Sequence, residues 1–138
     1  IPKWIATILN KEDVYINGDG STSRDFCFIE NAVQANILAA CADNESKNQV
    51  YNCALGDRTS LNELYHLIKK ALIKNGIIVN SSPIFRDFRP GDVKHSQANI
   101  DKAKNMLNYN PEWRIEAGIN KVVPWFIDNL KNSNFKEK

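Results

Sequence analysis

One stretch carries most of the information about the fold: Val14-Tyr15-Ile16-Asn17-Gly18-Asp19-Gly20-Ser21-Thr22-Ser23-Arg24-Asp25-Phe26. Residues 14–17 have the composition of a strand, and the Gly-, Ser- and Thr-rich residues 18–23 have that of a turn. Residues 24–29 predict a second extended segment. A helix is expected from about Glu30, with a core face made of Val33, Ile37, Ala40 and Cys41.

Outside this stretch, periodicity predicts a helix over residues 4–9, strand-like runs over 50–55, 77–79 and 84–85, and helices over 60–76, 99–107 and 115–130. Helix 60–76 is the best marked, because Ser60 and Glu63 have the spacing of a capping box and Gly76 can close the helix. Pro124 is expected to kink the last helix. Residues 86–97 show no periodicity and predict a loop, and the Lys-rich end from Lys131 is expected to fray.

Composition excludes several classes of function. The 138 residues include 18 Lys and Arg against 16 Asp and Glu, so a net charge of +2 offers no electrostatic footprint for nucleic acid or an anionic membrane. The chain has no apolar run of membrane-spanning length and no signal-peptide pattern. Three cysteines without C-x-x-C spacing argue against a secreted disulfide framework and a zinc site, and favour a cytoplasmic protein. With Ile1 first and Met106 the only methionine, a fragment is expected.

Two glycine- and acid-containing patterns are matched only in part. The G-x-G of Gly18 and Gly20 lacks a third glycine and does not open a helix, so it does not predict a dinucleotide site. A calcium loop beginning at Asp19 would place Arg24 where the sharp turn needs glycine. Both patterns are better explained as a turn.

Tyr65 and Lys69 have the Tyr-x-x-x-Lys spacing of a catalytic pair, but they lie between core leucines of the capped helix and no catalytic serine precedes them. His66 and His95 have no i, i+4 partner that would favour a metal. We therefore expect no catalytic, cofactor-binding or metal-binding residues in this chain.

Two arginines in separate loops remain as candidates, Arg24 and Arg89. The planar guanidinium fork matches phosphate oxygens, so the pair could clamp a diphosphate, and Asp92 could accept hydrogen bonds from a ribose diol. Residue types alone favour the alternative of surface salt bridges, between Arg24 and Asp25 or Asp19 and between Arg89 and Asp87 or Asp92.

Segments along nearly the whole chain, in order, resemble the C-terminal part of the extended short-chain dehydrogenase/reductase family, the NAD-dependent nucleotide-sugar epimerases and dehydratases. They are residues 1–4, 14–20, 23–26, 51–52, 58–64 and 88–98. Residues 15–20 and 91–96 are most similar to the bacterial UDP-N-acetylglucosamine 4-epimerases of O-antigen and Vi-type polysaccharide synthesis. The resemblance implies an α/β fold: the C-terminal substrate-binding portion of an extended Rossmann-type enzyme, a small sheet with flanking helices, in which residues 1–138 bind a UDP-sugar.

The resemblance also implies residue roles, and it favours ligand binding over the salt bridges. The residues are Arg24 and Arg89 on the diphosphate, Asp92 on the ribose, Tyr15 and Asn17 along the uracil, and Ser96 beside the sugar. A small residue at the position of Ser96 leaves room for an N-acetyl group. NAD and the catalytic Ser and Tyr-x-x-x-Lys set would belong to an N-terminal Rossmann domain that this chain lacks.

The implied function is the UDP-binding portion of an NAD-dependent UDP-N-acetylhexosamine 4-epimerase that acts through a transient 4-keto intermediate and is inactive as this chain alone. The complete enzyme is expected to be a cytoplasmic homodimer. Two alternatives stay open. One is a nucleotide-sugar dehydratase or UDP-glucuronate decarboxylase of the same family, and the other is a non-catalytic nucleotide-sugar-binding module.

Overall fold

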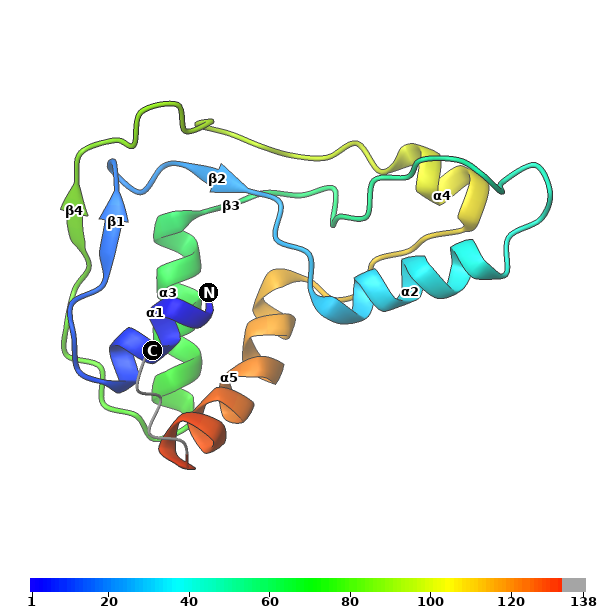
Figure 1. Ribbon diagram of the computed structural model, residues 1–138. Helices are drawn as coiled ribbons and strands as arrows, with labels where there is room; N and C mark the ends of the chain where they lie inside the picture. Colours follow the sequence, from blue (N-terminus) through cyan, green and yellow to red (C-terminus); the bar gives the residue numbers. More distant parts are fainter. Residues whose placement is uncertain (133–138) are drawn as a thin grey trace. The chain divides into compact units, whose positions relative to one another are not determined.

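The computed structural model describes residues 1–132 (Figure 1). The frayed end expected from Lys131 thus lies, from residue 133 on, outside the described residues. The elements are α1 (Pro2–Leu9), β1 (Tyr15–Asn17), β2 (Ser23–Arg24), α2 (Ile29–Ala40), β3 (Thr59–Ser60), α3 (Leu61–Lys74), β4 (Ile84–Arg86), α4 (Asp101–Leu107) and α5 (Ile115–Asn132). The fold is therefore α/β, with short strands and flanking helices. No helix among residues 1–132 combines the length and apolar character needed to cross a membrane.

The chain forms two compact units, each assembled from separate stretches of sequence. Of the described residues, the first comprises 1–22, 60–92 and 116–132, and the second comprises 23–59 and 93–115. In the part of the chain that the structure describes, β1 pairs with β4 and β2 with β3, and an isolated bridge joins Ser23 to His95.

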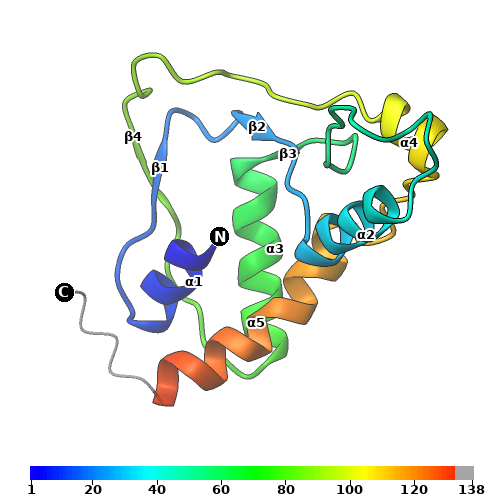
Figure 2. The same ribbon diagram turned by 45° about the vertical axis from the view of Figure 1, so that its right-hand side comes forward.

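The first unit contains the parallel pair of β1 and β4, which run side by side in both views (Figures 1 and 2). Tyr15 pairs with Ile84 and Asn17 with Arg86. Strand alternation buries Ile16 to 1% exposure and leaves Tyr15 and Asn17 on the opposite, exposed face. The core of the unit is aliphatic and aromatic and includes Ile5, Ile16, Leu64, Tyr65, Ile68, Leu72 and Val123.

Helix α3 confirms the predicted capping box. The Ser60 Oγ accepts a hydrogen bond from the Glu63 N–H at 3.2 Å, and a Glu63 carboxylate oxygen accepts one from the Ser60 N–H at 2.8 Å. The hydrogen bonds that the Ser60 N–H and the Ser60 hydroxyl donate to the carboxylate lower the pKa of the Glu63 carboxyl. Two backbone N–H groups at the start of the helix, which have no partner within it, are satisfied in this way.

The second unit packs α2 against α4 around a small core of Ala54, Ile100, Ala103 and Tyr109. Asp25 joins the loops of this unit. Its carboxylate accepts hydrogen bonds from the backbone N–H groups of Leu55 at 2.9 Å, Gly56 at 3.0 Å and Ala98 at 3.3 Å. The unit is thus held together by one carboxylate as well as by apolar contacts.

Two strand predictions are wrong, because residues 50–55 and 77–79 form no strand. In the extended segment predicted over residues 24–29, Arg24 belongs to β2, residues 25–28 have no regular secondary structure, and Ile29 begins α2. Val50 is 85% exposed, and the Leu55 N–H bonds the Asp25 side chain instead of a neighbouring strand. β-propensity expresses how well a residue fits a paired, half-buried surface, and these segments have no partner strand.

The core face predicted for α2 is also wrong. Val33 is 47% and Ile37 58% exposed, and Ala40 and Cys41 are exposed too. The buried face carries Asn31, whose side-chain amide exchanges two hydrogen bonds with the backbone of Trp113, while Ala35 and Leu38 pack on the small core. Apolar residues lie on both sides of this helix, so periodicity alone could not rank the two faces.

Candidate functional site

An open groove of about 1030 Å³ in the first unit brings together four of the six predicted site residues. Tyr15 and Asn17 enter it from β1, and Arg89 and Asp92 from the loop after β4. β1 and this loop are far apart in sequence, and the parallel pairing of β1 with β4 brings them together. The groove therefore combines aromatic, amide, cationic and acidic groups.

The loop after β4 presents its two predicted residues at the ends of one tight turn. The Asp92 N–H donates to the Arg89 carbonyl at 3.1 Å, Pro90 occupies the second position and Gly91 the third, with φ of +77°. This is the pattern of a type II turn, in which proline suits the second position and the third needs the positive φ that glycine adopts without strain. Arg89 and Asp92 are therefore held three residues apart on a defined backbone.

The Arg89 guanidinium is available for a ligand. Its side chain is exposed, and within residues 1–132 it makes no hydrogen bond or ion pair. The salt bridge of Arg89 with Asp87 or Asp92, which residue types alone favoured, is therefore not formed. An exposed guanidinium fork in a groove can donate hydrogen bonds to two oxygens of a phosphate at once.

Sequence reasoning missed one residue of the groove, Arg86. Its guanidinium carbon lies 3.3 Å from the centroid of the Tyr15 ring, a cation–π contact that holds the guanidinium flat against the ring. Because Arg86 pairs with Asn17, its side chain belongs to the same strand edge as the predicted residues. The available signal was its position at the end of a strand directly before the charged loop.

The G-x-G turn at residues 18–20 is filled by protein side chains. A Cβ on Gly18 would collide with the Phe88 ring, and one on Gly20 with the Asn62 amide. The turn leads into β2 and does not open a helix, so it lacks the backbone N–H groups with which a helix N-terminus holds a dinucleotide phosphate. These residues do not fit NAD.

The other two predicted residues belong to the second unit. The half-buried Arg24 is in β2 and its Nη1 donates to the Ser23 carbonyl at 2.8 Å. The side chain of Ser96 is exposed, and its backbone N–H bonds the same carbonyl at 3.1 Å. The Ser23 hydroxyl in turn lies 2.9 Å from Nδ1 of His95. Arg24 and Ser96 thus meet at the backbone of Ser23.

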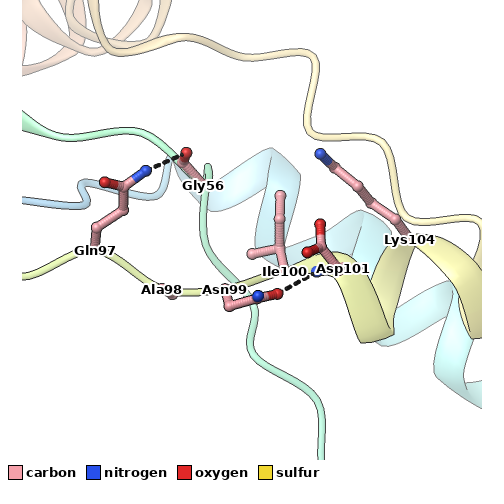
Figure 3. A pocket seen from close by; sticks show the side chains of 7 residues that line it. All are labelled: Gly56, Gln97, Ala98, Asn99, Ile100, Asp101 and Lys104. Carbon is pink, nitrogen blue, oxygen red and sulfur yellow. Dashed lines mark hydrogen bonds between the residues drawn. The ribbon is translucent and has the colours of Figure 1, made fainter.

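A second pocket, of about 340 Å³, lies wholly in the second unit and contains none of the predicted residues (Figure 3). Its side chains already bond to protein: Gln97 Nε2 donates to the Gly56 carbonyl at 2.7 Å, and the Asn99 Oδ1 accepts from the Asp101 N–H at 2.8 Å (Figure 3). These bonds hold loops together and start α4, so this pocket is a weaker candidate than the groove.

The remaining chemical candidates have structural roles. The Tyr65 hydroxyl donates to the Ser81 carbonyl at 2.8 Å and the Lys69 ammonium to the same oxygen at 3.2 Å, and Tyr65 is only 2% exposed. The pair therefore anchors a loop on α3. Among the residues that the structure describes, no cluster of three or more His, Cys, Asp or Glu side chains could hold a metal ion.

Comparison with known proteins gives matches to epimerases and dehydratases of nucleotide sugars. The family model described as GDP-mannose 4,6-dehydratase matches residues 1–122. The chain spans about two fifths of the length of the curated relatives it matches, 38% in two of them.

The solved structures that are similar to this fold include the following three. The UDP-N-acetylglucosamine 4-epimerase of Methanobrevibacter ruminantium, in complex with UDP-N-acetylmuramic acid, is 37% identical with a TM-score of 0.81, covering 93% of this chain and 39% of that one. The Thermotoga maritima UDP-glucose 4-epimerase with UDP-glucose has 31% identity, the same TM-score and the same coverage. A Bordetella bronchiseptica enzyme in complex with NADH has 25% identity and a TM-score of 0.76, covering 95% and 37%.

Proposed function

Because the chain belongs to the nucleotide-sugar epimerase and dehydratase family of extended short-chain dehydrogenases/reductases, we propose that it is the UDP-sugar-binding portion of a 4-epimerase. The observation that carries the proposal is the groove of the first unit. Tyr15, Asn17, Arg89 and Asp92 were all selected from sequence for one ligand, and all four line this groove. Unrelated surface residues would not be expected to gather in one place.

The functional groups that line the groove match the parts of a nucleoside diphosphate. Arg89 offers a guanidinium fork for the diphosphate, and Asp92, at the other end of the same turn, is an acceptor for the two ribose hydroxyls. Tyr15 and Asn17 on β1 are proposed to lie along the uracil, and Arg86 adds a second guanidinium. For Arg24 in the second unit, we propose contact with the diphosphate, as the resemblance implies.

Firm binding of the nucleotide by this groove fits the chemistry of a 4-epimerase. The sugar must turn over between the two halves of the reaction, so it has to be held loosely while the nucleotide is held firmly. Charge-assisted hydrogen bonds from arginine are worth about 1.5–3 kcal/mol each, which makes the diphosphate the natural anchor. The residues of this chain therefore bind and orient the substrate and do not take part in the bond-changing steps.

NAD is proposed to be bound by a Rossmann domain outside residues 1–132, where it would supply hydride transfer to and from the sugar. The G-x-G turn of this chain does not fit a dinucleotide, which supports this division. Ile29, Val33 and Ile37 form an exposed apolar stripe on α2, which offers such a domain a surface to pack on. We propose a cytoplasmic homodimer that acts in polysaccharide synthesis.

For the substrate we propose a UDP-N-acetylhexosamine, because Ser96 is small and exposed where the resemblance implies the sugar. The alternatives are a dehydratase, a UDP-glucuronate decarboxylase and a binding module without catalysis. The mass of the product identifies a dehydratase or a decarboxylase, and chromatography separates the isomer made by an epimerase from the unreacted substrate that a binding module leaves. An epimerase returns an isomer of unchanged mass, a dehydratase a product short of one water, and a decarboxylase one short of carbon dioxide.

The test is to incubate the full-length protein with NAD and UDP-N-acetylglucosamine and to analyse the nucleotide sugars by chromatography and mass spectrometry. Formation of UDP-N-acetylgalactosamine supports the proposal. UDP binding without any turnover of UDP-N-acetylglucosamine, UDP-glucose or UDP-glucuronate would favour the binding module. Absence of UDP binding would refute the assignment of the groove.

A further inference from the structure

We propose that Cys27 and Cys53 form a reactive dithiol site, which small-molecule disulfides oxidise to an intramolecular disulfide. The proposal does not depend on the proposed function. It rests on the second unit, where two cysteines separated by 26 positions in sequence meet at one tyrosine hydroxyl.

The meeting point is the hydroxyl of Tyr109. The Cys27 Sγ lies 4.0 Å and the Cys53 Sγ 3.8 Å from its oxygen. The hydroxyl donates its own proton to the Ala54 carbonyl at 2.8 Å, so its oxygen has only acceptor capacity left for the two thiols. Both sulfurs therefore lie within 4.0 Å of the same oxygen, while each thiol also has a backbone carbonyl within reach, that of Phe28 at 3.6 Å for Cys27 and that of Asn31 at 4.0 Å for Cys53.

The two segments that carry the cysteines are already tied together. The Asp25 carboxylate, two residues before Cys27, accepts the N–H groups of Leu55 and Gly56, which follow Cys53. A disulfide between these segments would therefore close along a contact that the backbone already makes. Disulfides need their two Cα atoms close together, and a pre-existing link between the segments favours this geometry.

The two thiols differ in accessibility, which sets the order of the reaction. Cys53 is exposed, whereas Cys27 is half-buried. Burial, and after it the charge of the neighbouring Cys53 thiol, raises the pKa of Cys27, with Asp25 acting in the same direction. The Cys53 thiolate is thus the first to attack.

With oxidised glutathione as the oxidant, the chemistry balances in two exchanges. The Cys53 thiolate attacks one glutathione sulfur, the glutathione disulfide bond breaks, and one glutathione thiolate leaves. The Cys27 thiolate then attacks the Cys53 sulfur of the mixed disulfide and expels the second glutathione. The protein thiols lose two protons and two electrons, and glutathione disulfide is reduced to two thiols.

The experiment treats the native protein with oxidised glutathione, alkylates the remaining thiols with a maleimide, and identifies linked peptides by mass spectrometry. Within this chain, two of the three cysteines should lose maleimide reactivity, and a Cys27–Cys53 peptide pair should appear that dithiothreitol abolishes. Cys41 is exposed and outside the cluster, so Cys41→Ser is the matched control and should give the same linked pair.

Two further variants test the order of attack. Cys27→Ser should leave glutathione bound to Cys53, and Cys53→Ser should leave Cys27 largely reduced over the same period. A native protein that keeps glutathione on Cys53 while Cys27 stays reactive would overturn the proposal. So would full maleimide reactivity of all three cysteines, or a linked pair that contains Cys41.

Discussion

At the scale of single residues, two arginines of the groove differ in what holds them. Arg86 lies flat on the Tyr15 ring, 3.3 Å from its centroid, while Arg89, three residues later, has no side-chain partner among residues 1–132. A stacked guanidinium has lost much of its freedom before a ligand arrives, whereas an unattached one must be ordered by the ligand. Binding of the ligand should therefore order the Arg89 side chain, whereas the Arg86 side chain is already held against Tyr15 before the ligand binds.

Replacing Arg89 by Ala in the full-length protein should weaken UDP binding by about 1.5–3 kcal/mol, roughly ten- to a hundredfold. Arg89→Lys should recover only part of this, because an ammonium lacks the planar fork. Isothermal titration calorimetry with UDP measures both effects. The control is Arg114→Ala, which removes an exposed arginine of the second unit near Asp57 and should leave UDP affinity unchanged. Unchanged affinity in Arg89→Ala would remove this residue from the site.

Ser96 is expected to control the choice of sugar. In the full-length enzyme, Ser96→Tyr should lower kcat/KM for UDP-N-acetylhexosamines at least about tenfold more than for UDP-glucose or UDP-galactose, because a phenol ring fills the space that an N-acetyl group needs. Kinetics on both substrate pairs measure the difference. Ser82→Tyr, at another exposed loop serine, is the control and should affect neither pair. Equal losses on both pairs would exclude a role in selectivity.

At the scale of elements, short structures with explicit caps and turns place the functional groups. The type II turn at residues 89–92 orients Arg89 and Asp92, and the capping box fixes the start of α3 behind the groove residue Leu61. Both depend on local chemistry, namely a glycine with positive φ and a serine–glutamate pair. Their contributions can be measured by substitutions that leave the ligand contacts in place.

Gly91→Ala should weaken UDP binding although the added methyl group has open space around it. The φ of Gly91 is +77° and an added Cβ would meet no atom within 4 Å, so the only cost is backbone strain of about 1–2 kcal/mol. The strain favours another turn geometry and moves Arg89 relative to Asp92. Gly76→Ala is the matched control, with φ of +78°, equally open space and a position outside the groove. It should lower thermal stability without changing UDP affinity in calorimetry.

Ser60→Ala should destabilise the protein by about 1 kcal/mol at pH 7 through loss of the cap of α3. Because the pKa of Glu63 is lowered in the folded state, its carboxylate stabilises the fold above the unfolded pKa, near its ordinary value of 4.5. This stabilisation by the Glu63 carboxylate is lost as the pH falls through the pKa that Glu63 has in the folded protein. Urea unfolding of wild type and variant should therefore show a smaller difference at pH 3 than at pH 7. Ser82→Ala, which removes no cap, should show no difference at either pH.

At the scale of the whole molecule, each unit is built from segments far apart in sequence, so long-range polar links matter as much as local propensity. Asp25 is the clearest example. One carboxylate accepts N–H groups from two loops and thereby joins residues 25, 55–56 and 98. Its role as a structural anchor differs from the surface salt bridge with Arg24 that composition suggested.

Asp25→Ala should destabilise the fold by at least about 1.5–3 kcal/mol, because backbone N–H groups lose a charged acceptor. Asp25→Asn keeps one acceptor oxygen and should recover part of the loss. Chemical denaturation followed by circular dichroism provides the free energies. Asp57→Ala removes an exposed carboxylate 3.6 Å from Arg114 and should cost less than about 1 kcal/mol. Equal effects of Asp25→Ala and Asp57→Ala would contradict the anchoring role.

The helices could be predicted from local sequence, because the capping residues, the spacing of the apolar residues and the residue that ends the helix all lie within one segment. Helix α3, with Ser60, Glu63 and the apolar stripe from Leu64 to Leu72, was predictable in this way, and so was β1. The loop predicted over residues 86–97 is found except that Arg86 ends β4 and His95 forms a β-bridge with Ser23. The candidate residues of the groove could be selected from sequence because their types match a nucleotide and their segments resemble a family. Where they lie in space required the structure.

Tertiary structure alone decided which candidate partners meet. Residues 50–55 have strand composition but no neighbouring strand, α2 buries Asn31 and exposes Val33 and Ile37, and Arg86 enters the site only because β4 pairs with β1. In each case the outcome depends on a distant part of the chain, as with Asp25 for Leu55, Trp113 for Asn31 and Tyr15 for Arg86. Composition and periodicity report the intrinsic preference of a segment, whereas burial and pairing are properties of the folded chain.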